Sequence, residues 1–355
     1  MAERHDAAGR ARRGRARAGT AAPRELCHDA GSAGTLTDRI LIPRALTPAA
    51  FAGRDAGAIV ESFSGETMGT SWSLQAVSPP AETEAGVQAA LDRVVAQMSQ
   101  WEPDSDLSRF NCAAPGEWHD IPAEFGHVVG EALDIARASG GAFDPGLGRI
   151  TDAWGFGSAG PVGHPPVASD PPARRTIEFD PATRRIRRGE AAALDLSGIA
   201  KGYGVDLAAE WLLGQGVRHF LLEVGGELRG EGIRPDGQPW WVDVEMPPTC
   251  SLPGCRVALH DLSVATSGNY RRYFSMDGEH YSHSFDPASG RPIVNGVSSV
   301  TVLHRQCMVA DGWATALTVL GPQAALALAE AQGLAACIVE GDREYISRAW
   351  RTMMD

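Results

Sequence analysis

The 355-residue sequence lacks several features that mark common classes of protein. It contains no run of 18 apolar residues, which a membrane-spanning helix would need. It also lacks the Gly-x-x-x-x-Gly-Lys-Ser/Thr loop with which many nucleoside triphosphatases bind phosphate. Asp and Glu outnumber Lys and Arg by 44 to 32, and the net charge of -12 argues against a nucleic-acid-binding surface. These absences lead us to expect a globular protein with no transmembrane segment and no nucleic-acid partner.

Cysteine is sparse, and none of the six cysteines belongs to a Cys-x-x-Cys pair. This absence argues against a zinc ribbon and against a thioredoxin-type redox motif. Cys250 and Cys255 in "CSLPGC" are the nearest pair and leave a small surface disulfide open. Free thiols are the better expectation if the protein is cytosolic.

The first 55 residues are rich in Arg, Ala and Gly and show no apolar periodicity. This composition is typical of a solvated, disordered tail. The basic start is not followed by the apolar stretch of a secretory signal, and a twin-arginine export signal fails for the same reason. We therefore expect residues 1–55 to form a tail, residues 56–355 to form one folded domain, and the protein to be cytoplasmic.

The remaining sequence combines the two-residue period of strands with the spacing of amphipathic helices. Residues 102–118 are expected to be a loop, residues 155–172 a long surface loop, and residues 263–274 and 279–287 a paired hairpin. Helices are expected over residues 84–101, 122–139, 198–215, 309–321 and 324–333, and strands over 71–77, 176–179, 186–189, 219–232, 240–246, 296–304, 335–340 and 344–350. Because the strands cluster in runs, we predict the α+β class.

The segment "LDLSGIAKGYGVD" (194–206) places charged groups at the entrance of a helix. A helix N-terminus offers free N–H groups to a phosphate, and Lys201 adds a positive charge. Asp195 can bind a ribose or ribityl hydroxyl or orient Lys201, and the Gly198 carbonyl can bind a metal. An equally good explanation is a helix capped by Ser197, with Lys201 in solvent.

In "MVADGWATALTVLG", Asp311 and Thr315 are four residues apart and so share one face of a helix. Together they can offer two oxygen ligands to a hard cation such as Mg²⁺. Taken alone, the pattern is more simply explained by Asp311 as a helix cap and Thr315 as a buried neighbour.

Five further residues carry side chains suited to a flavin or to proton transfer. His283 in "HSFDPASGRP" has a near-neutral ordinary pKa and could act as a general base, although taken alone the motif is more simply explained by a surface histidine beside a turn. In "GGAFDPGLG", Phe143 could stack on a ring and Asp144 could bind its edge. Met68 and Trp101 could cover a flat heterocycle, with core packing as the simpler explanation.

Eight segments, taken in order, resemble the ApbE family of FAD:protein FMN transferases. They are "ETMGTSWS", "SQWEPDSDLSRFN", "GGAFDPGLG", "LDLSGIAKGYGVD", "LLEVGGELRGEG", "SVATSGNYRRYF", "YSHSFDPASGRPI" and "VADGWATALTVLG", and they extend over residues 65–321. The resemblance implies a Mg²⁺-dependent enzyme that transfers FMN from FAD to a threonine hydroxyl of an acceptor protein and releases AMP. It also implies two interleaved β-rich lobes with helices and a flavin cleft between them.

The resemblance assigns roles residue by residue. The metal is expected at the Gly198 carbonyl, Asp311 and Thr315, and the base at His283. FAD is expected at Met68, Trp101, Ala142, Phe143, Asp144, Asp195, Lys201 and Phe285.

The sequence departs from the family pattern at three places. Ala314 stands where some relatives have an Asp before the metal-binding Thr, Trp101 stands where Tyr is common, and "DPASG" replaces "DPRTG". Because Ala314 removes one carboxylate, a flavin-storage protein without catalysis stays open as an alternative. A Mg²⁺-dependent FAD pyrophosphatase, in which water replaces the threonine, is a second alternative.

Overall fold

The computed structural model describes residues 39–162, 166, 175–270, 273–276 and 279–354. These residues belong to one unit, 34–355. The first 38 residues of the expected tail and most of the second half of the expected 155–172 loop lie outside the described residues.

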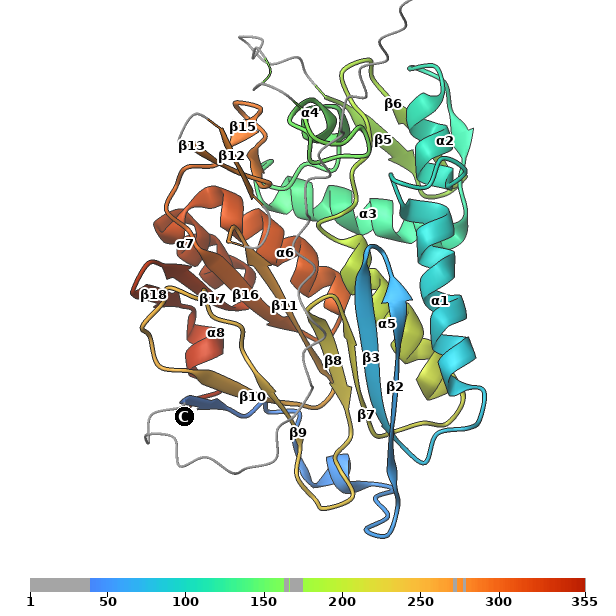
Figure 1. Cartoon of the computed structure of the whole chain (residues 1–355), viewed down its shortest axis with the longest axis vertical. Helices are drawn as coiled ribbons and strands as arrows, with labels where there is room; N and C mark the ends of the chain where they lie inside the picture. The colour runs from blue at the N-terminus through green and yellow to red at the C-terminus, as the bar shows by residue number, and fades with distance from the viewer. Residues whose placement is uncertain (1–38, 163–165, 167–174, 271–272, 277–278, 355) are drawn as a thin grey trace, which may run out of the picture. The chain divides into compact units, whose positions relative to one another are not determined.

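An eight-stranded antiparallel sheet is the largest element of the structure (Figure 1). Its strands lie in the order β18-β17-β16-β11-β8-β7-β3-β2. Their bounds are β2 Val60–Thr67, β3 Thr70–Val77, β7 Phe220–Val224, β8 Glu227–Glu231, β11 Leu262–Gly268, β16 Ser299–His304, β17 Ala335–Glu340 and β18 Arg343–Ile346. Gly225 and Gly226 join β7 to β8 with positive φ at both positions, as the tightest hairpins require.

Both faces of this sheet are covered. Alternate residues of a strand point to opposite faces, and Leu222 and Ile338 pack in one core whereas Leu221 and Cys337 pack in another. Six helices contribute buried residues to the first core: α1 Thr83–Met98, α2 Asp106–Cys112, α3 Ala123–Ala138, α5 Ala200–Gly214, α6 Cys307–Leu320 and α7 Pro322–Gln332. The second core lies against a small sheet of β1 Arg39–Leu41, β10 Cys255–Leu259 and β9 Trp240–Asp243, together with α8 Arg348–Arg351.

The remaining elements lie, with α2 and α3, beyond one end of the large sheet, at the top of Figure 1. They are β4 His119–Asp120, α4 Gly148–Ala153, β5 Ile177–Asp180, β6 Arg185–Arg188, β12 Tyr273–Met276, β13 Glu279–Ser282, β14 Phe285–Asp286 and β15 Arg291–Pro292. The α+β class is confirmed, and helices over 84–101, 122–139, 198–215, 309–321 and 324–333 are found with slightly different ends.

Four sequence expectations are corrected. Part of the expected tail is ordered, since β1 pairs with β10 and a 3₁₀ helix covers Pro48–Phe51. The expected loop 102–118 contains α2, whose N-terminus is capped by Ser105. Within 263–274, β11 joins the large sheet, and only β12 pairs with β13. The last expected strand ends at Ile346, and α8 follows.

The structure also bears on the possible disulfide and on the question of a membrane-spanning helix. The five cysteines of the described part of the chain carry free thiols, so Cys250 and Cys255 are not joined. In the same part of the chain, no helix combines the length and the apolar character that a membrane crossing requires.

Candidate functional site

The residues expected to bind a metal meet where the segment before α5 contacts α6. The hydroxyl of Thr315 donates a long hydrogen bond to the carbonyl oxygen of Gly198, with 3.4 Å between the oxygens. One turn earlier in α6, Oδ2 of the buried Asp311 accepts the backbone N–H of Gly202 at 3.0 Å. Because α6 begins at Cys307, Asp311 lies in its second turn and is not the helix cap that the simpler explanation required.

Lys201 joins this group from the first turn of α5. Its Nζ lies 2.5 Å from Oε2 of Glu227, the first residue of β8. Burial raises the pKa of Asp311, and the charge of Lys201 opposes that rise. Burial also raises the pKa of the Cys307 thiol well above its usual value, and the carboxylates of Asp206, Glu227 and Asp311 raise it further. Several charged groups therefore surround one buried point between α5, α6 and β8.

Asp195 is turned toward its own loop. Its Oδ1 accepts the N–H of Ser197 at 2.9 Å and also the Ser197 hydroxyl. These contacts do not give Asp195 the alternative role of orienting Lys201. Ser197 is not the helix cap either, because α5 begins at Ala200 and no side chain caps it. The N–H of Asp195 donates to the Pro145 carbonyl at 2.8 Å. This bond ties the segment to residues 140–147, which carry Ala142, Phe143 and Asp144 and are called the flavin loop below.

A pocket of about 600 Å³ lies along that loop. At its edge, Oδ2 of Asp144 pairs with Nε of Arg175 at 2.9 Å, and Oδ1 accepts the N–H of Gly146 at 2.8 Å. Phe143 is buried, and a side chain added at Gly198 would meet its Cε2 atom at 3.4 Å. The pocket is lined by Leu133, Ala136, Gly141, Phe143, Asp144, Pro145, Arg175, Thr176, Ile177 and Glu178.

His283 and Phe285 form a second group around an aromatic side chain. The buried Phe285 ring lies 5.8 Å from the Phe156 ring, and the half-buried His283 ring lies 6.4 Å from the same ring. Arg175 links this group to the pocket, because it also donates to the Pro287 carbonyl. The structure therefore places the expected base in a neighbourhood of its own, beside the flavin loop.

The last three expected flavin contacts differ in their exposure. Ala142 is buried beside Phe143. Met68 lies in the turn between β2 and β3 with a φ of 49°, and a side chain added at Gly204 would lie 2.9 Å from its Cε. Met68 thus packs partly on α5, as the simpler explanation proposed. Trp101 is 48% exposed on the loop after α1, so core packing does not explain it.

Glu227 and Arg175 were missed by the sequence analysis. Glu227 stands in a quoted segment, "LLEVGGELRGEG", and its signal was a carboxylate that directly follows a Gly-Gly turn inside an otherwise buried strand pair. Arg175 precedes a short strand at the end of a Gly- and Pro-rich stretch, and no local pattern marks it.

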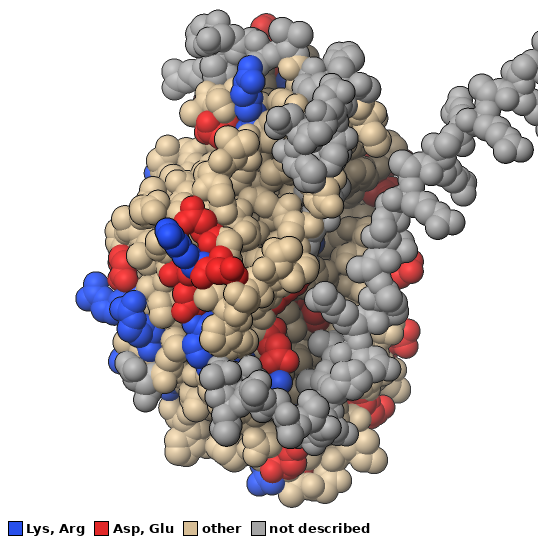
Figure 2. Space-filling view, turned by 60° about the vertical axis from the view of Figure 1, so that its left-hand side comes forward, with Lys and Arg blue, Asp and Glu red and all other residues tan. Residues whose placement is uncertain are grey.

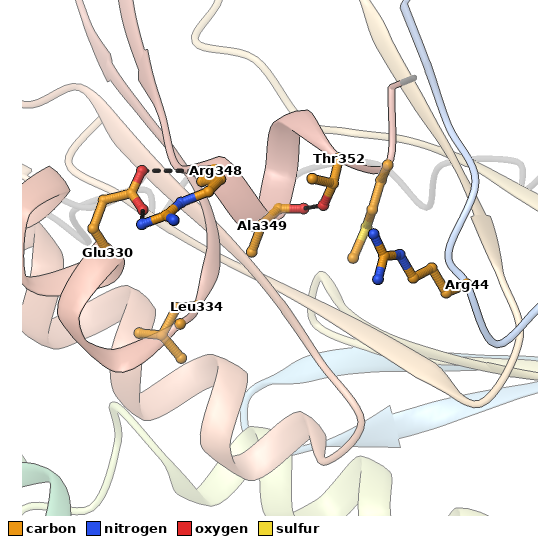
Figure 3. Close-up of a pocket in the computed structure, with 8 residues that line it drawn as sticks. Arg44, Glu330, Leu334, Arg348, Ala349 and Thr352 are labelled. Carbon is orange, nitrogen blue, oxygen red and sulfur yellow. Dashed lines mark hydrogen bonds and ion pairs between the residues drawn. The ribbon is translucent and has the colours of Figure 1, made fainter.

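A second pocket, of about 450 Å³, lies beside α7 and α8 (Figure 3). Arg44, Leu334 and the ion pair between Glu330 and Arg348 are among the residues that line it. Figure 2 shows another view of the surface, on which charged residues of both signs lie side by side in small groups. No sequence-predicted residue lines this pocket.

Comparison with known proteins finds relatives that match most of the chain. The model of the ApbE family matches residues 68–338. An FAD:protein FMN transferase of Vibrio cholerae is 36% identical over 316 residues, covering 82% of this chain and 92% of the relative. One of Haemophilus influenzae is 33% identical over 309 residues, covering 82% and 89%. The crystal structure of the apo flavinyl transferase ApbE of Pseudomonas stutzeri superposes with a TM-score of 0.77 at 36% identity, covering 84% of this chain and 97% of that one.

Proposed function

Because the chain belongs to the ApbE family, we propose that it is an FAD:protein FMN transferase. In the proposed reaction, a threonine hydroxyl of an acceptor protein attacks the FMN phosphorus of FAD. The new phosphoester bond forms as the pyrophosphate P–O bond breaks, and AMP leaves with that bridging oxygen. The threonine proton passes to a base.

The meeting of Gly198, Lys201, Asp311 and Thr315 at one corner is the observation that supports this function best. The donors are a carbonyl, a carboxylate and a hydroxyl, which is the all-oxygen set that a hard cation such as Mg²⁺ prefers. In the described part of the chain no three His, Cys, Asp or Glu side chains cluster as a metal site. The proposed site uses the single carboxylate of Asp311 with the Gly198 carbonyl and the Thr315 hydroxyl. Bound there, Mg²⁺ would supply positive charge to the pyrophosphate.

The residues of the chain divide the remaining work. The Lys201 ammonium stabilises the charge that grows on the leaving phosphate. His283, in its neutral form, accepts the threonine proton on a ring nitrogen. The flavin and its ribityl chain are held by Phe143 and Asp144 on one loop and Asp195 on the next, with Ala142, Met68, Trp101 and Phe285 as further contacts.

AMP release and acceptor labelling test the proposal together. The purified protein is incubated with FAD, with or without Mg²⁺ and an acceptor protein that carries a flavinylation threonine. The transferase releases AMP and labels the acceptor, and EDTA abolishes both. AMP without labelling across several acceptors would favour the pyrophosphatase, and tight FAD binding without AMP would favour flavin storage.

A further inference from the structure

Helix α6 receives its N-terminal cap from another helix. It begins at Cys307, and no side chain of its own segment caps it. Instead, Oδ1 of Asp206 on α5 accepts the N–H of Cys307 at 3.0 Å, and Oδ2 accepts the N–H of Met308 at 2.9 Å. A carboxylate at a helix N-terminus satisfies free N–H groups and interacts well with the helix dipole. Asp206 therefore fixes both the start of α6 and its position against α5.

The contacts between the two segments repeat at every turn. Asp206 contacts residues 307 and 308, Gly202 contacts Asp311, and Gly198 contacts Thr315. The spacing of four residues on each side means that neighbouring contacts use successive helical turns. A shift of α6 by one position would consequently break the cap and move Asp311 and Thr315 away from Gly198 together.

Helices α5 and α6 approach each other so closely at Gly202 that no space is left for a side chain. A side chain added there would lie 2.4 Å from the carbonyl oxygen of Cys307 and 2.8 Å from Cβ of Asp311. Any larger residue must push α6 away from α5. Gly202 and Asp206 thus both set the distance between α5 and α6. Gly202 does so by allowing close contact, and Asp206 does so by hydrogen bonding.

The charge of Asp206 is balanced without the expected metal ligands. Nη1 of Arg229 donates to its Oδ1 at 2.9 Å, and Nη2 of Arg229 donates to Glu231 at 2.8 Å. All three side chains are largely buried. Buried ionic groups add little net stability, but their fixed geometry can specify how elements pack. This network is therefore suited to fixing the position of α6 against α5.

We propose that Asp206 is a positioning residue of the metal site, which holds α6 in the register that brings Asp311 and Thr315 to Gly198 and Lys201. The inference rests on the proposed function, since it names a residue that shapes the site of that reaction without touching the substrate.

Three variants of the full chain separate positioning from simple stabilisation. Asp206→Asn removes the carboxylate, and Gly202→Ala forces the helices apart. Ser347→Ala is the control, because its buried hydroxyl caps α8 through the N–H of Trp350 and bonds the N–H of Ala336, outside the α5–α6 contact. Each variant is first ranked by its free energy of unfolding in urea.

Binding of Mn²⁺, followed by electron paramagnetic resonance in the presence of FAD, is the readout. We expect the Mn²⁺ dissociation constant to rise about 10-fold or more in Asp206→Asn and Gly202→Ala, the range seen when residues that support metal ligands are changed. Asp206→Glu, which keeps the carboxylate, should recover part of the loss, and Ser347→Ala should bind like the wild type despite its lower stability.

Three results would overturn the inference, and the last of them would also remove the proposed metal site. Equal Mn²⁺ binding by the wild type and both α5 variants, or losses that follow stability across all variants including Ser347→Ala, would overturn the positioning role alone. A wild-type protein that binds no Mn²⁺ would overturn the metal site of the proposed function as well.

Discussion

The Nζ atom of Lys201 lies 2.5 Å from Oε2 of Glu227, whose side chain is only 3% exposed, whereas that of Lys201 is 31% exposed. One side of the ammonium group thus meets a buried carboxylate, and part of the side chain remains open to solvent. A buried carboxylate is costly without an opposite charge. Lys201 therefore serves both the fold, as the partner of Glu227, and the proposed site.

Lys201→Met should destabilise the protein because it leaves Glu227 buried without this positive charge. We expect the free energy of unfolding to fall by about 1–3 kcal/mol. The double variant Lys201→Met/Glu227→Gln should recover much of this loss, since no buried charge remains. Urea unfolding of both single variants and the double variant completes the cycle. Additive losses would show that the two side chains do not interact.

His283→Ala should keep FAD binding and lose FMN transfer. Loss of a general base typically lowers the rate by about 10²–10⁴-fold, while the flavin contacts stay in place. Flavin fluorescence measures binding, and acceptor labelling measures transfer. His127→Ala, at an exposed position of α3, is the control. Transfer at the wild-type rate in His283→Ala would remove His283 as the base.

Arg175→Met should weaken FAD binding, because Arg175 connects Asp144 of the flavin loop to the carbonyl of Pro287. Without it, the two loops that carry expected flavin contacts lose a common anchor, and we expect a loss of roughly 10-fold in affinity from one charge-assisted hydrogen bond. Arg256→Met is the matched control, since Arg256 pairs with Asp243 on the small sheet and neither residue lines the pocket. An equal effect of the two changes on FAD affinity would argue against a specific role for Arg175.

His219 should make the stability depend on pH. Burial lowers its pKa below the ordinary 6.5 and outweighs the hydrogen bonds to the backbone of Gly53 and Ala52, which raise it. The unfolded chain therefore binds a proton that the folded chain does not, and the free energy of unfolding should decline as the pH falls below about 6.5 toward the folded pKa.

The variant His219→Asn tests this dependence while keeping a side-chain acceptor for the N–H of Ile233. Its free energy of unfolding should fall less steeply between about pH 7 and pH 5 than that of the wild type. Urea unfolding at several pH values gives both curves. Parallel curves would show that His219 does not contribute.

Local patterns in the sequence predicted most helices and the pairing of Asp311 with Thr315 on one face, because helical spacing is visible within a single segment. The partners were harder to predict. Glu227 reaches Lys201 only because the β7–β8 hairpin packs beside α5, and Gly198 meets Thr315 across 117 residues. The three-residue strand β1 is defined by its pairing with β10, more than 200 residues later, and so carries little local signal.

The difference between local patterns and partners distant in the sequence also explains two misassigned segments. The segment 102–118 was expected to be a loop, but Ser105 caps a short helix there. In 263–274, alternation correctly indicated strand structure but could not identify the neighbours of β11, which are β8 and β16. The residues assigned to FAD and to the metal stay predictions until a ligand is bound.

The intact mass of an acceptor protein, measured after incubation with this enzyme, FAD and Mg²⁺, tests the central claim most directly. The account predicts a gain of one FMN, absent when the acceptor threonine is changed to alanine and absent when EDTA is present. An acceptor of unchanged mass, under conditions in which a Vibrio cholerae FAD:protein FMN transferase labels it, would contradict the proposed function.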